Sequence, residues 1–548
     1  MDFNLKKVHL WRCFLVTLVL SWCALSVPAY AKDTTKDTIK NNTENSKKTT
    51  NAKKSAPALA KMHFDAENEP KPAQALPSSI KNVLKKYKIP EENISIYVRD
   101  LNASKPLLEH NADVLRSPAS TMKLLTTYAA LKELGPNYSW RTEVWLRGKL
   151  EDGVLAGDLI LKGYGDPFLV YENFWKLVKT LRDKGLKEIQ GDVIIDNSYF
   201  SLPAYDPGAF DGKPFRVYNA QVSALMFNFQ ATRFLFRPVL NKNKQASDLI
   251  TRKKNKQGKN KNKKKNSWGR VDVIPLPKII GFDFDNQIKL TRGKCRKSHY
   301  RPKFSRNKSG KLVIKGNYAA DCKQQFILRS VSTPEEHAFN AFRDFWTDLH
   351  GVLKGHLKIG RVQSGDERFH VYSSPTLGQQ IRLINKWSNN VMTRQLLLTL
   401  GARRYGAPAT PEKGRRAILQ ILAENNINTN GIQMENGSGL SRIAKITARQ
   451  MGSLLETAYR DAYMPEFMAS LSLPGVDGTL VNRFRREDLR GRSHLKTGTL
   501  NYVTAISGYM LNRSGKRLVI VIQHNGKKTG GGRGAKIQNA LLRWCFEQ

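Results

Sequence analysis

The segment Ser120-Thr121-Met122-Lys123 constrains this 548-residue chain more than any other short stretch. It reads S-x-x-K and leads into an apolar run that predicts a helix, with Ser117 as N-cap and Pro118 at the first helical position. Side chains three positions apart share a helix face, so the lysine amine is expected beside the serine hydroxyl. A buried lysine has a lowered pKa and can take the hydroxyl proton. Alone, however, S-x-x-K also fits an ordinary capped helix.

A second polar segment, Ser388-Asn389-Asn390, precedes the apolar helical run Val391 to Leu400. It reads S-x-N. A hydroxyl and a side-chain amide two residues apart could move a proton and hold a substrate carbonyl. Ser and Asn also favour helix N-caps, and this segment by itself is more typical of a cap.

A third segment, Lys496-Thr497-Gly498-Thr499, reads K-T-G and is followed by strand-like residues to Tyr509. A turn at 512–516 and the apolar run 517–523 complete a hairpin pattern. Gly498 allows a backbone to approach a substrate closely, and the lysine and threonines beside it can bind a carboxylate. On its own the segment is equally compatible with a strand edge that carries a bulge.

Together, S-x-x-K, S-x-N and K-T-G in this order form the signature of serine penicillin-binding proteins and class A β-lactamases. The chain from about Ile80 to its C-terminus resembles the D-alanyl-D-alanine carboxypeptidase/endopeptidase family, the low-molecular-mass class C penicillin-binding proteins. The supporting stretches are Gly163–Phe168, Gly191–Asp196, Tyr218–Leu225, Glu435–Arg442 and Gly475–Thr479. One departure is Asn436, which stands where many relatives have aspartate.

The long interval between the first and second motifs predicts an insertion. The pattern along the chain predicts a discontinuous catalytic domain of mixed α and β type, at 78–148 and 331–548, around a β-rich region at 149–330. The family resemblance implies an α/β fold with a serine β-lactamase/transpeptidase-like catalytic domain, whose antiparallel sheet is flanked by helices, and two nested domains within the inserted region. The predicted strands are 155–162, 189–196, 222–228 and 271–275; the predicted helices are 170–185, 411–424, 447–459 and 537–546.

The first 31 residues have a basic start, an apolar run and the sequence Ala29-Tyr30-Ala31, which predict a signal peptide cleaved after Ala31. Residues 32–77 are expected to form a disordered basic linker. No later segment is long and apolar enough to span a bilayer. We therefore expect an exported protein, periplasmic or otherwise associated with the cell envelope.

The formal net charge is +45. Part of it lies in a Lys-rich stretch at 241–270, expected to be a disordered surface loop. Such a loop could bind anionic lipid headgroups, teichoic acid or lipopolysaccharide, or could be solvated without a partner. The basic residues are not interleaved with aromatic side chains, so no nucleic-acid partner is expected.

Three cysteines follow the predicted signal peptide. Because an exported chain meets an oxidising compartment, Cys295 and Cys322 are expected to form a disulfide. Cys545 is predicted to be a buried thiol. No cysteine or histidine spacing matches a metal site, and we expect neither a metal nor an organic cofactor.

The family resemblance implies roles for the motif residues. Ser120 would attack a D-Ala-D-Ala or D-Ala-meso-diaminopimelate bond of peptidoglycan with Lys123 as its base, and β-lactams would trap the acyl-enzyme. Ser388 and Lys496 would pass the proton to the leaving amine, and Asn390 would hold the peptide backbone. The terminal carboxylate would bind Lys496 and the side chains of Thr497 and Thr499, beside Gly498. The backbone N–H groups of Ser120 and Thr499 would form the oxyanion hole, and Asp211 is a candidate for binding the substrate amine.

Two other functions remain open at this point. One is a β-lactamase or esterase on the same fold, against which stand the length of the chain and the lack of an E-x-x-L-N motif after Ser388. The other is a catalytically weak protein that binds envelope polyanions, against which stand the intact motifs.

Overall fold

The computed structural model describes residues 75–241, 269–278, 283–296 and 302–548. The predicted signal peptide, nearly all of the predicted linker and most of the Lys-rich stretch lie outside these residues. Among the described helices, none is long and apolar enough to cross a membrane.

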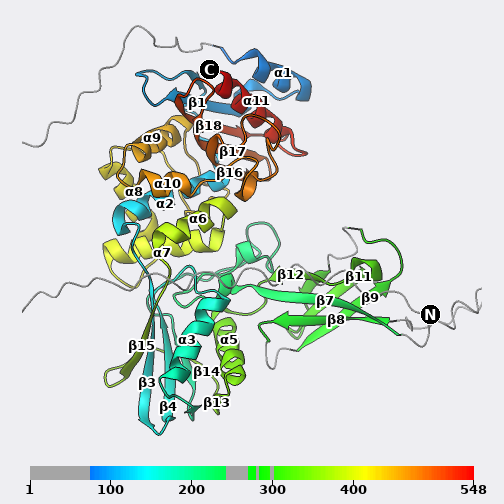
Figure 1. The fold of residues 1–548 in the computed structure, drawn as a ribbon, viewed down its shortest axis with the longest axis vertical. Helices are drawn as coiled ribbons and strands as arrows, with labels where there is room; N and C mark the ends of the chain where they lie inside the picture. The colour runs from blue at the N-terminus through cyan, green and yellow to red at the C-terminus, as the bar shows by residue number, and fades with distance from the viewer. Residues whose placement is uncertain (1–74, 242–268, 279–282, 297–301) are drawn as a thin grey trace, which may run out of the picture. The chain divides into compact units, whose positions relative to one another are not determined.

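A five-stranded antiparallel sheet joins the two ends of the described chain (Figure 1). Its strands, in spatial order, are β16 (Ser493–Leu500), β17 (Val503–Leu511), β18 (Arg517–Asn525), β1 (Ile94–Asp100) and β2 (Leu108–His110). β1 pairs with β18 in a register that sets Ile96 opposite Ile522. The predicted hairpin is confirmed as β17 and β18, and the K-T-G segment lies inside β16.

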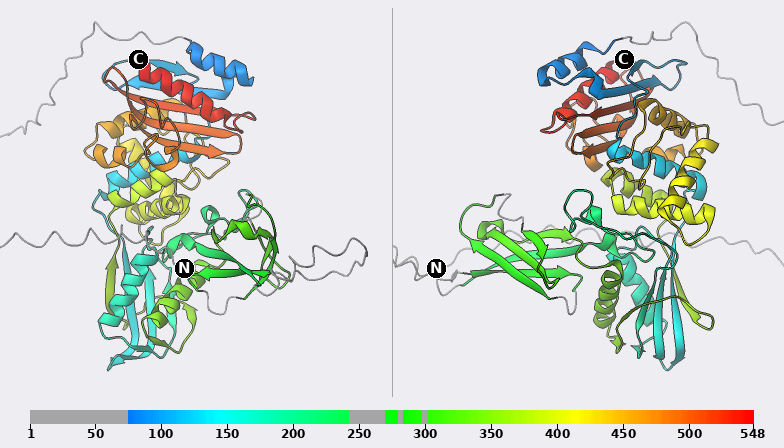
Figure 2. Two further views of the ribbon diagram at one scale, coloured as in Figure 1. Left: turned by 45° about the vertical axis from the view of Figure 1, so that its right-hand side comes forward. Right: turned by 180° about the vertical axis from the view of Figure 1, so that it is seen from behind.

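Both faces of this sheet are covered by helices. Helices α1 (Ser78–Tyr87) and α11 (Arg533–Glu547) lie on the same face, as Figure 2 shows from two further directions. Side chains alternate between the faces of a strand. Ile96 and Ile520 accordingly pack with α1 and α11, whereas Tyr97 and Val521 pack with the helices opposite.

The helices of the opposite face carry most of the remaining core. They are α2 (Lys123–Leu134), α6 (Leu377–Trp387), α7 (Asn390–Tyr405), α8 (Pro411–Glu424), α9 (Ala448–Tyr459) and α10 (Met464–Ala469). The predicted helices at 411–424 and 447–459 are confirmed, and Thr447 caps α9 through a capping box with Gln450. The fold class expected from the sequence is therefore the observed one.

A second, mixed sheet has its own core with two helices. Its strands are β3 (Arg141–Glu151), β4 (Val154–Gly163), β5 (Glu188–Ile189), β6 (Val193–Asp196), β13 (Val352–Leu353), β14 (Leu357–Ile359) and β15 (Glu367–Ser373). The helices are α3 (Tyr171–Asp183) and α5 (Pro334–Asp348). The sheet and α5 extend past the predicted bounds of 149 and 330 on both sides, because β3 pairs with β15. We propose bounds near 141 and 373 for the inserted region.

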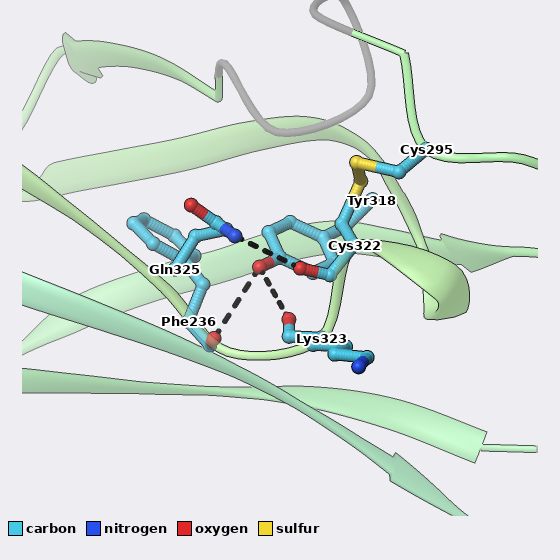
Figure 3. The surroundings of a disulfide bond; sticks show 6 residues. All are labelled: Phe236, Cys295, Tyr318, Cys322, Lys323 and Gln325. Carbon is cyan, nitrogen blue, oxygen red and sulfur yellow. Dashed lines mark hydrogen bonds between the residues drawn. A yellow bond between two sulfur atoms is a disulfide. The ribbon is translucent and has the colours of Figure 1, made fainter.

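Two three-stranded sheets share a smaller core. One contains β7 (Thr232–Leu240), β8 (Gly269–Leu276) and β12 (Gln325–Arg329); the other contains β9 (Phe284–Thr291), β10 (Lys303–Arg306) and β11 (Leu312–Ala319). The predicted disulfide is present here between Cys295 and Cys322 (Figure 3). Tyr318 lies beside it and donates its hydroxyl to the Lys323 carbonyl at 2.8 Å.

The predicted strand at 222–228 is wrong. These residues are mostly buried, which explains the apolar pattern, but their backbone groups pair with loops and side chains rather than with a strand. Gln395 Nε2 donates to the Ser223 carbonyl at 2.8 Å, and Leu225 N donates to Asn197 Oδ1 at 2.7 Å. A short buried apolar run cannot by itself distinguish a strand from a buried loop.

Removing the disulfide is expected to destabilise the small two-sheet region and leave the five-stranded sheet intact. The bond closes a sequence separation of 27 residues, for which the chain-entropy estimate is about 3.5 kcal/mol. Limited proteolysis of Cys295→Ser/Cys322→Ser should show faster cleavage within 232–329 than in the wild type. Equal cleavage rates in the two proteins would contradict this expectation.

Candidate active site

Ser120 lies in a short 3₁₀ turn, η3 (Ala119–Met122), and α2 begins only at Lys123. The predicted helix start at Ser117 is therefore wrong by one turn. Ala119 has a positive φ of 46°, which bends the chain before Ser120, and Thr121 N donates to the Pro118 carbonyl. A positive φ is uncommon for a residue other than glycine, and such residues cluster at active sites.

Lys123 joins the first and second motifs. Its Nζ lies 3.2 Å from Ser120 Oγ, 2.6 Å from Asn390 Oδ1 and 2.6 Å from the Ser438 carbonyl oxygen. The lysine is fully buried. Burial lowers the pKa of Lys123 well below its ordinary value, and the positive charges of Lys496 and Arg394 lower it further. The amine is thus poised to accept a proton from the adjacent hydroxyl.

The second motif lies where α6 meets α7. Ser388 ends α6 in the left-handed conformation, with φ 58°, and Asn389 caps α7 by accepting from Met392 N at 3.1 Å. The cap interpretation is therefore correct for Asn389. Its neighbours contact the two lysines of the site: Asn390 accepts from Lys123 and Ser388 from Lys496. Ser388 Oγ accepts from Lys496 Nζ at 2.9 Å.

Lys496 is the second fully buried lysine of the site. Its Nζ also donates to the Thr497 carbonyl at 2.9 Å, and burial lowers its pKa to about 7. The Thr497 hydroxyl lies 2.8 Å from the hydroxyl of Thr479. Thr479 is the last residue of the Val-Asp-Gly-Thr stretch at 476–479.

Gly498 permits β16 to lie directly against the turn that carries Ser120. β16 is an edge strand, so its outer side is free to face η3. A Cβ atom on Gly498 would lie 2.5 Å from the Pro118 carbonyl oxygen and 3.0 Å from Ser120 N. These contacts are too short for any side chain, which explains in steric terms why the third residue of K-T-G is glycine.

The motif residues open into a cavity of about 760 Å³. It is lined by Ser120, Ser388, Asn390 and Thr499, and also by Asp211, Tyr218, Trp387, Leu440 and Arg442. The volume is in the range of ligand pockets.

Asp211, the candidate for binding the substrate amine, is among the residues that line this cavity. Burial raises its pKa, but hydrogen bonds from Tyr218 and Asn219 and the charge of Lys213 hold the pKa of Asp211 below its usual range. The carboxylate is therefore charged at neutral pH, although its two oxygens already accept from Tyr218 at 2.7 Å and Asn219 at 2.8 Å.

Sequence reasoning missed two groups: one contacts Lys123 directly, and the other places a positive charge near it. One is the Ser438 carbonyl; the Asn-Gly-Ser-Gly sequence at 436–439 signals a turn but not its target. The other is Arg394, whose buried guanidinium donates to the Ala220 carbonyl at 2.6 Å. The signal in the sequence that could have indicated this residue is a charged arginine within the apolar helical run 391–400.

With this geometry in place, comparison with known proteins identifies the family. The family model described as "D-Ala-D-Ala carboxypeptidase 3 (S13) family" matches residues 76–548. The chain belongs to this family and is a serine-type D-Ala-D-Ala carboxypeptidase.

Individual relatives are distant in sequence but similar in extent. The D-alanyl-D-alanine carboxypeptidase DacB of Haemophilus influenzae is 23% identical over 446 residues, covering 81% of this chain and 88% of the relative. The D-alanyl-D-alanine carboxypeptidase of Actinomadura sp. (strain R39) is 26% identical over 451 residues, covering 79% and 77%. The crystal structure of penicillin binding protein 4 (dacB) from Haemophilus influenzae has a TM-score of 0.69 at 21% identity, covering 86% of this chain and 99% of that one. This last likeness supports the fold.

Replacing Gly498 by alanine is expected to push β16 away from η3. The new methyl group would overlap the Pro118 carbonyl, so hydrolysis of a D-Ala-D-Ala peptide should fall about 100-fold or more. Gly530→Ala is the matched control, because a Cβ there meets nothing within 4 Å. Equal kcat/KM for Gly498→Ala and Gly530→Ala would show that the close approach is unimportant.

Proposed function

We propose that the chain hydrolyses D-Ala-D-Ala termini and D-Ala-containing crosslinks of peptidoglycan through an acyl-enzyme on Ser120, and that β-lactams inhibit it. The observation that carries this proposal is the contact of Lys123 Nζ with Ser120 Oγ. A nucleophile within hydrogen-bond reach of a base whose pKa is lowered by burial is the arrangement that acyl transfer requires.

Acylation begins when Lys123 removes the Ser120 proton and Oγ attacks the carbonyl carbon of the substrate's penultimate D-Ala. The carbonyl oxygen becomes an oxyanion, which would accept hydrogen bonds from the backbone N–H groups of Ser120 and Thr499. When the intermediate collapses, the C–N bond breaks and the proton passes from Lys123 through Ser388 to the leaving amine. Lys496, 2.9 Å from Ser388 Oγ, polarises that relay.

Deacylation uses the same groups in reverse. Lys123 is neutral again once the amine has left, so it removes a proton from a water molecule that attacks the ester. The C–Oγ bond breaks and Ser120 recovers its proton. In a β-lactam the leaving nitrogen stays tethered to the acyl group, which favours a long-lived ester.

Substrate recognition follows from the charges around the cavity. The terminal carboxylate of a stem peptide would bind Lys496 and the hydroxyls of Thr497 and Thr499, while Asn390 would hold the peptide backbone. The charged carboxylate of Asp211 would bind an amine on the other side of the cavity. In a crosslinked substrate, D-Ala lies next to a diamino acid that can supply this amine. Asp211 therefore supports endopeptidase as well as carboxypeptidase activity.

Export follows from the substrate, because peptidoglycan lies outside the cytoplasmic membrane. We propose that the signal peptide at 1–31 directs export and that the Lys-rich stretch at 241–270 contacts anionic polymers or lipid headgroups of the envelope.

A variant lacking 242–268 should keep its acylation rate and lose retention on envelope fragments. Unchanged retention would contradict the proposed role of the Lys-rich stretch.

The acyl-enzyme predicts a single labelled residue. Mature protein incubated with a fluorescent penicillin should carry one stable adduct, located on Ser120 by peptide mass spectrometry and absent from Ser120→Ala. Intact drug without an adduct would favour a binding protein, and hydrolysed drug without an adduct would favour a β-lactamase.

The pH dependence of acylation should report the two lysines. Lys123 must be neutral to act as a base, and Lys496 must be charged to attract a carboxylate, so the rate should rise with pH and then fall. Because the pKa of Lys496 is about 7, the fall is expected near that pH. In Lys496→Arg it should move to higher pH, since a guanidinium keeps its proton. A fall at the same pH in both proteins would assign it to another group.

A further inference from the structure

The third motif has a hydrogen-bond partner from another part of the chain. The Thr497 hydroxyl lies 2.8 Å from the hydroxyl of Thr479, and either oxygen can be the donor. Thr479 belongs to the short 3₁₀ helix η8 (Gly478–Leu480) and is exposed. Thr497 and Thr499 are two residues apart on β16, so their side chains lie on the same face of the strand. Thr479 therefore contacts the pair of hydroxyls proposed to bind the substrate carboxylate.

The segment that carries Thr479 is anchored on β16. Ser472 N donates to the Leu495 carbonyl at 3.0 Å, and Leu495 N donates to the Ser472 carbonyl at 2.9 Å. Leu495 directly precedes Lys496, so this bridge joins the segment to the start of the third motif. The Ser472 hydroxyl donates to the Lys386 carbonyl at 3.3 Å, which joins the same segment to the end of α6.

An ion pair fixes the turn directly before Thr479. One carboxylate oxygen of Asp477 accepts from Lys386 Nζ at 2.5 Å, and the other accepts from Leu473 N at 2.9 Å. Gly478 has a φ of 57°, and a Cβ there would lie 2.7 Å from the Lys386 carbonyl oxygen. These contacts hold the backbone that presents the Thr479 hydroxyl to β16.

The number of protons gives the pair of threonines a direction when substrate is bound. A threonine hydroxyl has one proton to donate and two lone pairs, whereas a carboxylate can only accept. If Thr497 donates its proton to the substrate carboxylate, the proton between the two threonines must come from Thr479. The other hydroxyl near Thr479 is Ser472 Oγ, 3.4 Å away, and it directs its own proton at a carbonyl. A hydroxyl that accepts one hydrogen bond is polarised and donates a stronger one.

We propose that Thr479 is a positioning residue for carboxylate recognition: it donates to Thr497, and so orients and polarises the hydroxyl that binds the terminal carboxylate of the substrate. This inference rests on the proposed function, which assigns that carboxylate to Lys496, Thr497 and Thr499. It makes the preference for a free carboxylate depend on a residue outside the three motifs.

The test compares two substrates of the mature protein, an acyl peptide ending in D-Ala-D-Ala and the same peptide with a C-terminal amide. Thr479→Val replaces the hydroxyl by a methyl group and should lower kcat/KM for the free carboxylate about fivefold, mainly through KM. The amide carries no charge, so its hydrolysis should depend far less on this hydroxyl. Thr479→Ser keeps the hydroxyl and should retain the wild-type preference.

A double-mutant cycle tests whether Thr479 acts through Thr497. Adding Thr479→Val to Thr497→Val should lower kcat/KM for the free carboxylate no further, because the hydroxyl that Thr479 orients is already absent. Thr180→Val is the matched control. The Thr180 hydroxyl donates to the Lys176 carbonyl within α3, and its removal should leave the hydrolysis of both substrates unchanged.

The alternatives separate clearly. An equal loss for the two substrates in folded Thr479→Val, a wild-type preference in that variant, or additive losses in the cycle would overturn the inference and leave the proposed function standing. Unfolding temperatures identify a variant that does not fold, and Thr479→Ala then replaces Thr479→Val. If the wild type leaves the amide intact, the cycle decides. No adduct on Ser120 of the wild type would overturn both proposals.

Discussion

The burial of two lysine amines in the same site is the constraint on which the site depends. An ammonium group loses its hydration on burial, so a buried lysine tends to give up its proton unless an opposite charge holds it. Around Lys123 the compensating groups are neutral oxygens, from Ser120, Asn390 and Ser438, and the nearby charges are positive. The protein thereby keeps an amine in its basic form, at a cost in stability that the surrounding cores must offset.

That requirement explains why the site is assembled from distant parts of the chain. The two lysines come from α2 and β16, and the groups that bond them come from the α6–α7 junction and the turn at 436–440. The edge strand β16 lies against η3 because Gly498 has no side chain. Asp211 and Tyr218 also line the cavity, and the proposed function assigns Asp211 to substrate recognition.

Much of this was accessible from sequence because the chemistry is local in three motifs. S-x-x-K, S-x-N and K-T-G give the residue types and their spacing. The hairpin of β17 and β18 and several helices followed from the sequence pattern, and the antiparallel sheet as a whole was implied by the family resemblance. The disulfide followed from the three cysteines after the predicted signal peptide, of which Cys295 and Cys322 were expected to pair and Cys545 to stay a buried thiol. What periodicity could not supply was backbone detail: the 3₁₀ turn at Ser120 depends on the positive φ of Ala119, and the buried loop at 222–228 imitates a strand.

Long-range placement was the other gap. Nothing in the sequence around Asn436 says that a carbonyl two residues later meets Lys123, because that contact joins positions 315 residues apart. The pairing of β15 with β3, on which the proposed bounds of the inserted region rest, also joins distant parts of the chain, with more than 200 residues between the two strands.

A crystal structure of the mature protein after reaction with a β-lactam would show directly whether Ser120 is the nucleophile. We expect continuous density from Ser120 Oγ to the opened ring, with Lys123 Nζ still beside Oγ and the drug's carboxylate against Lys496 and Thr499. A drug bound without a covalent link to Ser120, or linked to another residue, would contradict this expectation.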